Sequence, residues 1–106
     1  MAIDNSAVAL PAPELITAMT GANVLIGSLA FNPTIIILDN QSTTAVVISI
    51  NNVSWKTFAG GEALVLDMRA AHGNARNYSF QVGDSFFGNG AANGSFSISY
   101  LYAKNS

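Results

Sequence analysis

The chain has 106 residues, a net charge of −2 and charged side chains at only 9% of its positions, against about 25% in an average soluble domain. This charge excludes the basic surface that binds nucleic acid or an anionic membrane, and the apolar half of the sequence excludes a disordered chain. Cysteine is absent, which excludes disulfides, thiolate metal sites and cysteine nucleophiles.

The first residues have no clear hydrophobic period. Pro11 and Pro13 favour an extended backbone, so we predict an extended N-terminal arm over residues 1–13 and one domain over residues 14–106. The arm is either mobile or laid on a neighbouring subunit. Its candidate subunit or lattice contacts are the apolar residues Ile3, Val8 and Leu10. No Lys or Arg occurs in the first ten residues, so we expect no secretion by a signal peptide.

From residue 14 onward, short apolar runs alternate with turn residues at intervals of about 8–12 residues, which is typical of an all-β sandwich or barrel. Residues 14–20 fit either a strand or one to two helical turns. The runs predicted as strands lie at 23–31, 34–39, 44–50, 53–58, 62–68, 77–82, 85–87 and from 95 onward. With about eight strands, we predict a single-domain antiparallel β-sandwich of the jelly-roll kind.

Four local patterns sharpen this prediction. Asn51 and Asn52 suit a two-residue hairpin turn, because Asn tolerates positive φ, and Gly27 suits a β-bulge. The run Ile-Ile-Ile-Leu at 35–38 favours a strand covered on both faces. Residues 88–94 favour a flexible Gly/Asn loop. The last strand alternates serine with Phe, Ile and Tyr over residues 95–100, which predicts a buried aromatic face backed by a serine row.

No constellation of catalytic residues is apparent. The single histidine, His72, lies in a Gly/Asn loop, which indicates a solvated side chain and not the base of a triad. The six carboxylates are scattered, with no spacing typical of a glycosidase pair or a calcium loop. We therefore expect a non-enzymatic protein without a metal or cofactor.

Three positions are candidate contact residues. Trp55, the only tryptophan, suits a core or sheet-face position, a subunit contact, or a platform for stacking a sugar. Asp67 and Arg69 share one strand face, so they can pair and fix the orientation of a neighbouring subunit. In the alternative function, a carbohydrate-binding module or host-glycan-binding virion component, Trp55 and Tyr78 would contact the glycan.

Residues 55–68 run from a polar hairpin strand through a glycine turn to an apolar strand ending in Leu-Asp, and a Gly/Asn-rich loop later precedes a closing Ser/aromatic strand at 95–102. Over roughly residues 39–103 the chain resembles small β-sandwich proteins of tailed-phage virions. The resemblance implies a capsid decoration (cement) protein or a small tail component, made in the host cytoplasm and located in the virion. Its expected partners are further copies of the chain, in a trimer, and the major capsid or tail protein.

Overall fold

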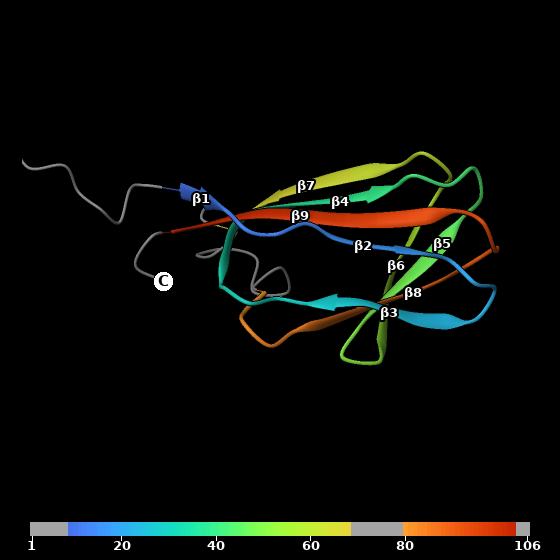
Figure 1. Cartoon of the computed structure of the whole chain (residues 1–106), viewed down its shortest axis with the longest axis horizontal. Coiled ribbons are helices and arrows are strands. Elements are labelled where there is room, and N and C mark those ends of the chain that lie inside the picture. The colour runs from blue at the N-terminus through green and yellow to red at the C-terminus, as the bar shows by residue number, and fades with distance from the viewer. Residues whose placement is uncertain (1–8, 69–79, 104–106) are drawn as a thin grey trace, which may run out of the picture.

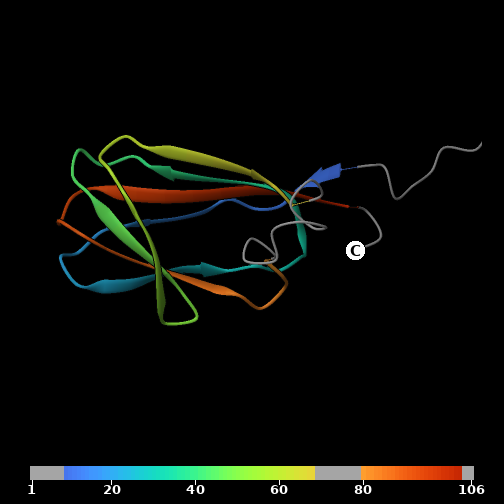
Figure 2. The same ribbon diagram turned by 180° about the vertical axis from the view of Figure 1, so that it is seen from behind.

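The computed structural model describes residues 9–68 and 80–103, which form two facing antiparallel sheets (Figures 1 and 2). Its strands are β1 (Ala9–Pro11), β2 (Leu15–Ala18), β3 (Asn23–Ser28), β4 (Pro33–Asn40), β5 (Val46–Ile50), β6 (Val53–Phe58), β7 (Ala63–Asp67), β8 (Ser85–Gly90) and β9 (Ser95–Ala103). The all-β, sandwich-like fold expected from the sequence is confirmed. The ambiguous segment at 14–20 contains strand β2.

The larger sheet, sheet A, has the order β1-β9-β4-β7, and β2 pairs with β9 as well. β1 pairs with residues 101–103 of β9 and β2 with residues 95–98, so they follow one another along the same edge. The smaller sheet, sheet B, has the order β3-β8-β5-β6. Four connections cross from one sheet to the other at the same end of the sandwich: β2 to β3, β4 to β5, β6 to β7 and β8 to β9 (Figure 1).

The core lies between the sheets and follows the alternation of the strands. On β9 the inward residues Phe96, Ile98 and Tyr100 are buried, as the sequence pattern predicted. Phe58 of sheet B meets Phe96 of sheet A edge to face, with ring centroids 5.1 Å apart, a geometry that favours aromatic pairs. Burying one such side chain stabilises the fold by about 1.5–3 kcal/mol. The other fully buried core residues are Met19, Ile36, Leu38, Val46, Ile48 and Phe86.

Two local predictions are confirmed. Asn51 and Asn52 join β5 to β6 with φ angles of 52° and 68°, the left-handed conformation that a type I′ turn requires. The Asn51 side chain accepts a hydrogen bond from Ser85 N at 3.0 Å, which ties this turn to β8. The pairing of β3 with β8 shifts register between Leu25 and Gly27, so a bulge lies where the glycine suggested one.

Three other predictions about the strands were wrong. β4 is covered on one face only, and Ile37 is 40% exposed, because sheet B lies against a single side of sheet A. β8 continues through Gly90, so the expected loop at 88–94 is shortened to residues 91–94. Residues 80–82, the described part of the strand predicted at 77–82, are not in a strand.

Close packing explains the glycines of β8. A Cβ atom on Gly90 would lie 2.7 Å from Val46 Cγ2, and one on Gly88 would lie 3.1 Å from Met19 Cε. These glycines let the backbone approach the core and do not mark a flexible segment.

The described end of the expected arm belongs to sheet A. β1 pairs with β9, and Ala12 N then donates a hydrogen bond to Tyr100 O at 2.9 Å. Residues 1–8, which hold Ile3 and Val8, lie outside the described residues.

Candidate functional site

The outer face of sheet A, which points away from sheet B, carries exposed aliphatic side chains on three strands. Ile16 of β2 is 51% exposed, Ile37 of β4 is 40% exposed and Val65 of β7 is 61% exposed. The strand register places Ile37 between Val65 on one side and Ser99 of β9 on the other. Ile37 and Val65 therefore form an apolar pair on neighbouring strands.

A groove of about 490 Å³ continues this apolar surface. It lies near the point where β1 and β2 follow one another along β9, an arrangement visible in Figure 1. The residues that line it are mostly aliphatic, with the carboxylate of Glu14 among them: Pro11, Ala12, Glu14, Ile35, Ile37, Ser99, Tyr100 and Leu101. We define the docking face as six apolar residues of this surface: Pro11, Ile16, Ile35, Ile37, Val65 and Leu101.

Among the described residues, the charges around the docking face are all negative. The described strands of sheet A contain no Lys or Arg, and their carboxylates are Asp39 on β4 and Asp67 on β7. Asp39 is half-buried and lies two residues after Ile37 on the same face of β4. Asp67 is exposed and lies opposite Ile35. An apolar centre without charge, bordered by charged groups, is the composition of a protein–protein contact.

The serine row of β9 lies on the same outer face and is already hydrogen-bonded within the protein. Gln41 Nε2 donates to Ser97 Oγ at 3.3 Å, and Ser95 Oγ donates to Gln41 Oε1 at 3.1 Å. Ser97 is also only 3% exposed. Because these hydroxyls have partners, covering the face removes few unpaired polar groups from water.

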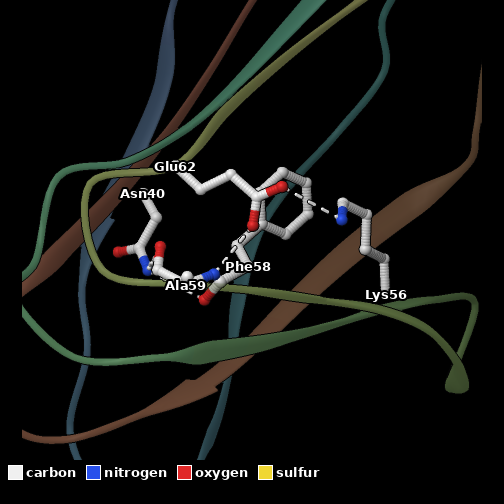
Figure 3. Close-up of polar contacts among 5 residues, drawn as sticks. All are labelled: Asn40, Lys56, Phe58, Ala59 and Glu62. Carbon is white, nitrogen blue, oxygen red and sulfur yellow. Dashed lines mark hydrogen bonds and ion pairs between the residues drawn. The ribbon is translucent and has the colours of Figure 1, made fainter.

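Asn40 holds together the loops at one end of the sandwich (Figure 3). Its side chain is fully buried at the end of β4, and its Nδ2 donates to Thr44 O at 2.9 Å, Ala59 O at 3.0 Å and Phe58 O at 3.2 Å. Its Oδ1 accepts from both N and Oγ of Ser42, at 3.0 and 2.6 Å. One amide therefore joins the β4–β5 loop to the β6–β7 turn.

An exposed ion pair stands beside this network (Figure 3). Glu62 Oε2 lies 3.2 Å from Lys56 Nζ, and Glu62 Oε1 accepts a hydrogen bond from Ala59 N at 2.8 Å. The hydrogen bond from Ala59 N, helped by Lys56, holds the pKa of Glu62 below its ordinary value of 4.5. Lys56 Nζ also lies 5.0 Å from the centre of the Phe58 ring, so the only described lysine is engaged within the turn.

A second hollow, of about 260 Å³, lies at this end between the β4–β5 loop and the β8–β9 turn. Its lining has hydroxyl, amide and backbone groups and no charge: Gln41, Ser42, Thr43, Thr44, Ala91, Ala92, Asn93, Gly94 and Ser95. We call it the polar cleft. Such a lining can form hydrogen bonds with a neutral ligand.

The structure does not bring the predicted contact residues together. Leu10 is half-buried on β1 and Asp67 lies at the end of β7, both in sheet A, whereas Trp55 lies on β6 in sheet B. The Trp55 ring packs edge-on against Phe80 with centroids 5.5 Å apart. The remaining candidates are outside the described residues: Ile3, Val8, Arg69 and Tyr78.

The sequence reasoning missed the docking face itself. The alternation in β4 places Ile35 and Ile37 on the face opposite to Ile36 and Leu38, but it does not show which of the two faces is uncovered.

Among residues 9–68 and 80–103, no group of three or more His, Cys, Asp or Glu side chains is placed to hold a metal ion. Within these same residues, no helix has the length and apolar character needed to span a membrane. Comparison with protein-family models, curated proteins and solved structures finds no match.

Proposed function

We propose that the sandwich is a jelly roll. The support comes from strand order. Without the short β1, sheet A reads β2-β9-β4-β7 and sheet B reads β3-β8-β5-β6, so each antiparallel pair in one sheet is continued by a pair in the other, as in two interlocked Greek keys. Jelly rolls occur in viral capsid and lectin domains, which narrows the functions worth testing without deciding between them.

We propose further that the chain is a non-enzymatic structural protein of a phage virion, which self-associates and docks on the capsid or tail lattice as a decoration protein. The observation that carries this proposal is the docking face, an apolar surface with no described basic residue on its sheet. A monomer that exposes a contiguous apolar surface usually has a partner for it. The arm expected over residues 1–13, with Ile3, Val8 and Leu10, would add contacts to a neighbouring copy.

The energetics of the docking face suit a lattice better than a single tight partner. Covering a half-exposed Ile or Val yields about 1 kcal/mol, since full burial yields about 1.5–3 kcal/mol. Association costs at least about 4 kcal/mol before any affinity appears. A few such side chains therefore give weak single contacts, which become strong when many copies are linked on one particle.

Co-sedimentation with assembled particles of the phage that encodes the chain tests this function. We expect the wild-type chain to pellet with the particles and the Ile37→Ser variant to bind several-fold more weakly. The matched control is Val53→Ser, because Val53 is 69% exposed but lies on sheet B. Binding that is absent in the wild type, or equally reduced by both variants, would contradict docking through sheet A.

A glycan-binding role is the second candidate, and the polar cleft favours it. Its neutral hydroxyl and amide groups suit the hydroxyls of a sugar, although Trp55 lies half-buried against Phe80. A glycan array with the wild type, Thr43→Val and Trp55→Ala separates the possibilities. Binding lost only in Thr43→Val assigns the glycan to the cleft, binding lost only in a folded Trp55→Ala variant assigns it to Trp55, and no binding above background dismisses this role.

A further inference from the structure

The edges of the two sheets are not equally protected against pairing with another strand. Native proteins blunt an exposed edge with prolines, lysines or bulges. The β3 edge has the register shift at Gly27, and the β6 edge has Lys56 and a register shift in its pairing with β5. The outer edge next to β9 is divided between β1 and β2, with Pro11 and Pro13 at the division.

β7 has none of these devices. Its five residues, Ala-Leu-Val-Leu-Asp, contain no proline, glycine or lysine. They pair with β4 in an unbroken register from Asp67 to Ala63. Within the described part of the chain, β4 is the only strand paired with β7, so β7 is the edge strand of sheet A among the described residues.

We propose that β7 pairs antiparallel with β7 of a second copy of this chain, about a twofold axis at Val65. This inference rests on the self-association in the proposed function and names the surface that performs it. It is an example of strand addition at a sheet edge, in which main-chain hydrogen bonds supply affinity and side-chain pairs supply register. An isologous contact of this kind closes on itself and does not grow into a fibre.

The sequence of β7 is complementary to itself in this register. With Val65 opposite Val65 of the second copy, Leu64 lies opposite Leu66 and Ala63 lies opposite Asp67. Val65 and the two leucines then face apolar side chains, and each Asp67 carboxylate lies opposite the small Ala63 and away from the other Asp67. Antiparallel partners point to the same face of a sheet, so a shift by one residue would place the outer Val65 opposite the inner Leu66 and join the outer face of one copy to the inner face of the other.

The pairing would also enlarge the docking face. Two sheets of five strands each would become one continuous sheet. Ile37 and Val65 of one copy would continue into Val65 and Ile37 of the other, because Ile37 already lies opposite Val65 on β4. A dimer would therefore offer a lattice two docking faces side by side. A twofold contact is also compatible with the expected trimer, because the two symmetries combine in a dihedral hexamer.

A cysteine at the proposed axis tests the register directly, since the chain has no cysteine of its own. In the Val65→Cys variant the two new thiols would face each other across the axis, with Cβ atoms about 4.5–5.5 Å apart. We expect a disulfide-linked dimer under mild oxidation, or a dimer captured by a short bis-maleimide. The control, Val53→Cys, has a similarly exposed position on β6 and should crosslink only at the background rate. Equal rates for both variants would overturn the proposal.

The mass in solution provides the second test. Sedimentation equilibrium should show that Val65→Lys halves the mass of the assembly, whereas Val53→Lys leaves it unchanged, with thermal melts to show that both variants fold. A wild-type chain that is monomeric at millimolar concentration overturns both the edge pairing and the self-association. An assembly whose mass is unaffected by Val65→Lys overturns the edge pairing alone. The Ile37→Ser variant should keep the mass while it loses particle binding, which separates this contact from docking.

Discussion

Replacing Asn40 by alanine should destabilise the protein by about 4 kcal/mol. The Asn40 amide has two hydrogens for its three carbonyl acceptors and accepts two further hydrogen bonds from Ser42, so we count four hydrogen bonds. Each contributes about 0.5–1.5 kcal/mol net. The loss is a large share of the roughly 5–15 kcal/mol by which a domain of this size is stable.

Urea unfolding followed by tryptophan fluorescence measures this loss, because Trp55 is the single tryptophan. The midpoint should fall at an unchanged slope, which shows altered stability without altered compactness of the unfolded chain. The matched control is Asn89→Ala, an exposed residue of β8, for which we expect less than about 0.5 kcal/mol. A loss below about 1 kcal/mol for Asn40→Ala would refute the bridging role of this amide.

The Asn40→Asp variant tests how stability changes with pH when the buried amide is replaced by a carboxyl group. It preserves shape but places a buried carboxyl among the carbonyl oxygens of Thr44, Phe58 and Ala59. Burial and these oxygens disfavour the charged form, so the pKa of the new carboxyl should be raised in the folded protein. The variant should therefore be least stable at neutral pH and recover stability, relative to wild type, as the pH falls and the carboxyl becomes protonated.

Three further predictions concern the fold. Folding lowers the pKa of Glu62 from 4.5, so the ionised carboxylate stabilises the protein above pH 4.5 and this contribution is lost as the pH falls below it. In thermal melts, the Glu62→Gln variant should therefore lose less stability than the wild type when the pH is lowered from about 6 to about 3. Gly90→Ala should cost about 1–3 kcal/mol in urea unfolding, and more than Gly88→Ala, because the added methyl group meets the stiff Val46 and not the flexible end of Met19. Asn52→Val should cost about 1–2 kcal/mol in the same assay, whereas Asn52→Gly should be neutral, since φ is 68° there.

Local sequence patterns made the β5–β6 turn and strand β9 predictable. The Asn pair at 51 and 52 and the alternation of β9 each specify one backbone conformation, and both predictions are confirmed. The glycines of β8 were misread, because a glycine that lets a strand approach the core is indistinguishable in sequence from one that makes a loop flexible. The identity of Val46 as the neighbour of Gly90 becomes known only when sheet B is assembled.

The docking face was less accessible to sequence reasoning for a similar reason. A run of four aliphatic residues is compatible with a strand covered on both faces, and only the position of β4 in a two-layer fold shows that Ile35 and Ile37 point outward. The contrast between β7 and the other edges also depends on strand order. The residues Ala63–Asp67 contain no pattern that indicates an edge position in the sheet.

The place of β9 has a consequence for how the chain acquires its structure. The last strand in the sequence is an inner strand of sheet A, bordered by β1 and β2 on one side and β4 on the other. Sheet A therefore remains incomplete on a ribosome until β9 has emerged, and β1 and β2 must wait for a partner about 80–95 residues away. Such distant pairings make folding slow, on the scale of milliseconds to seconds. During this interval the apolar strands are exposed to one another in neighbouring nascent chains, and the few charged side chains of the sequence offer them little protection from association.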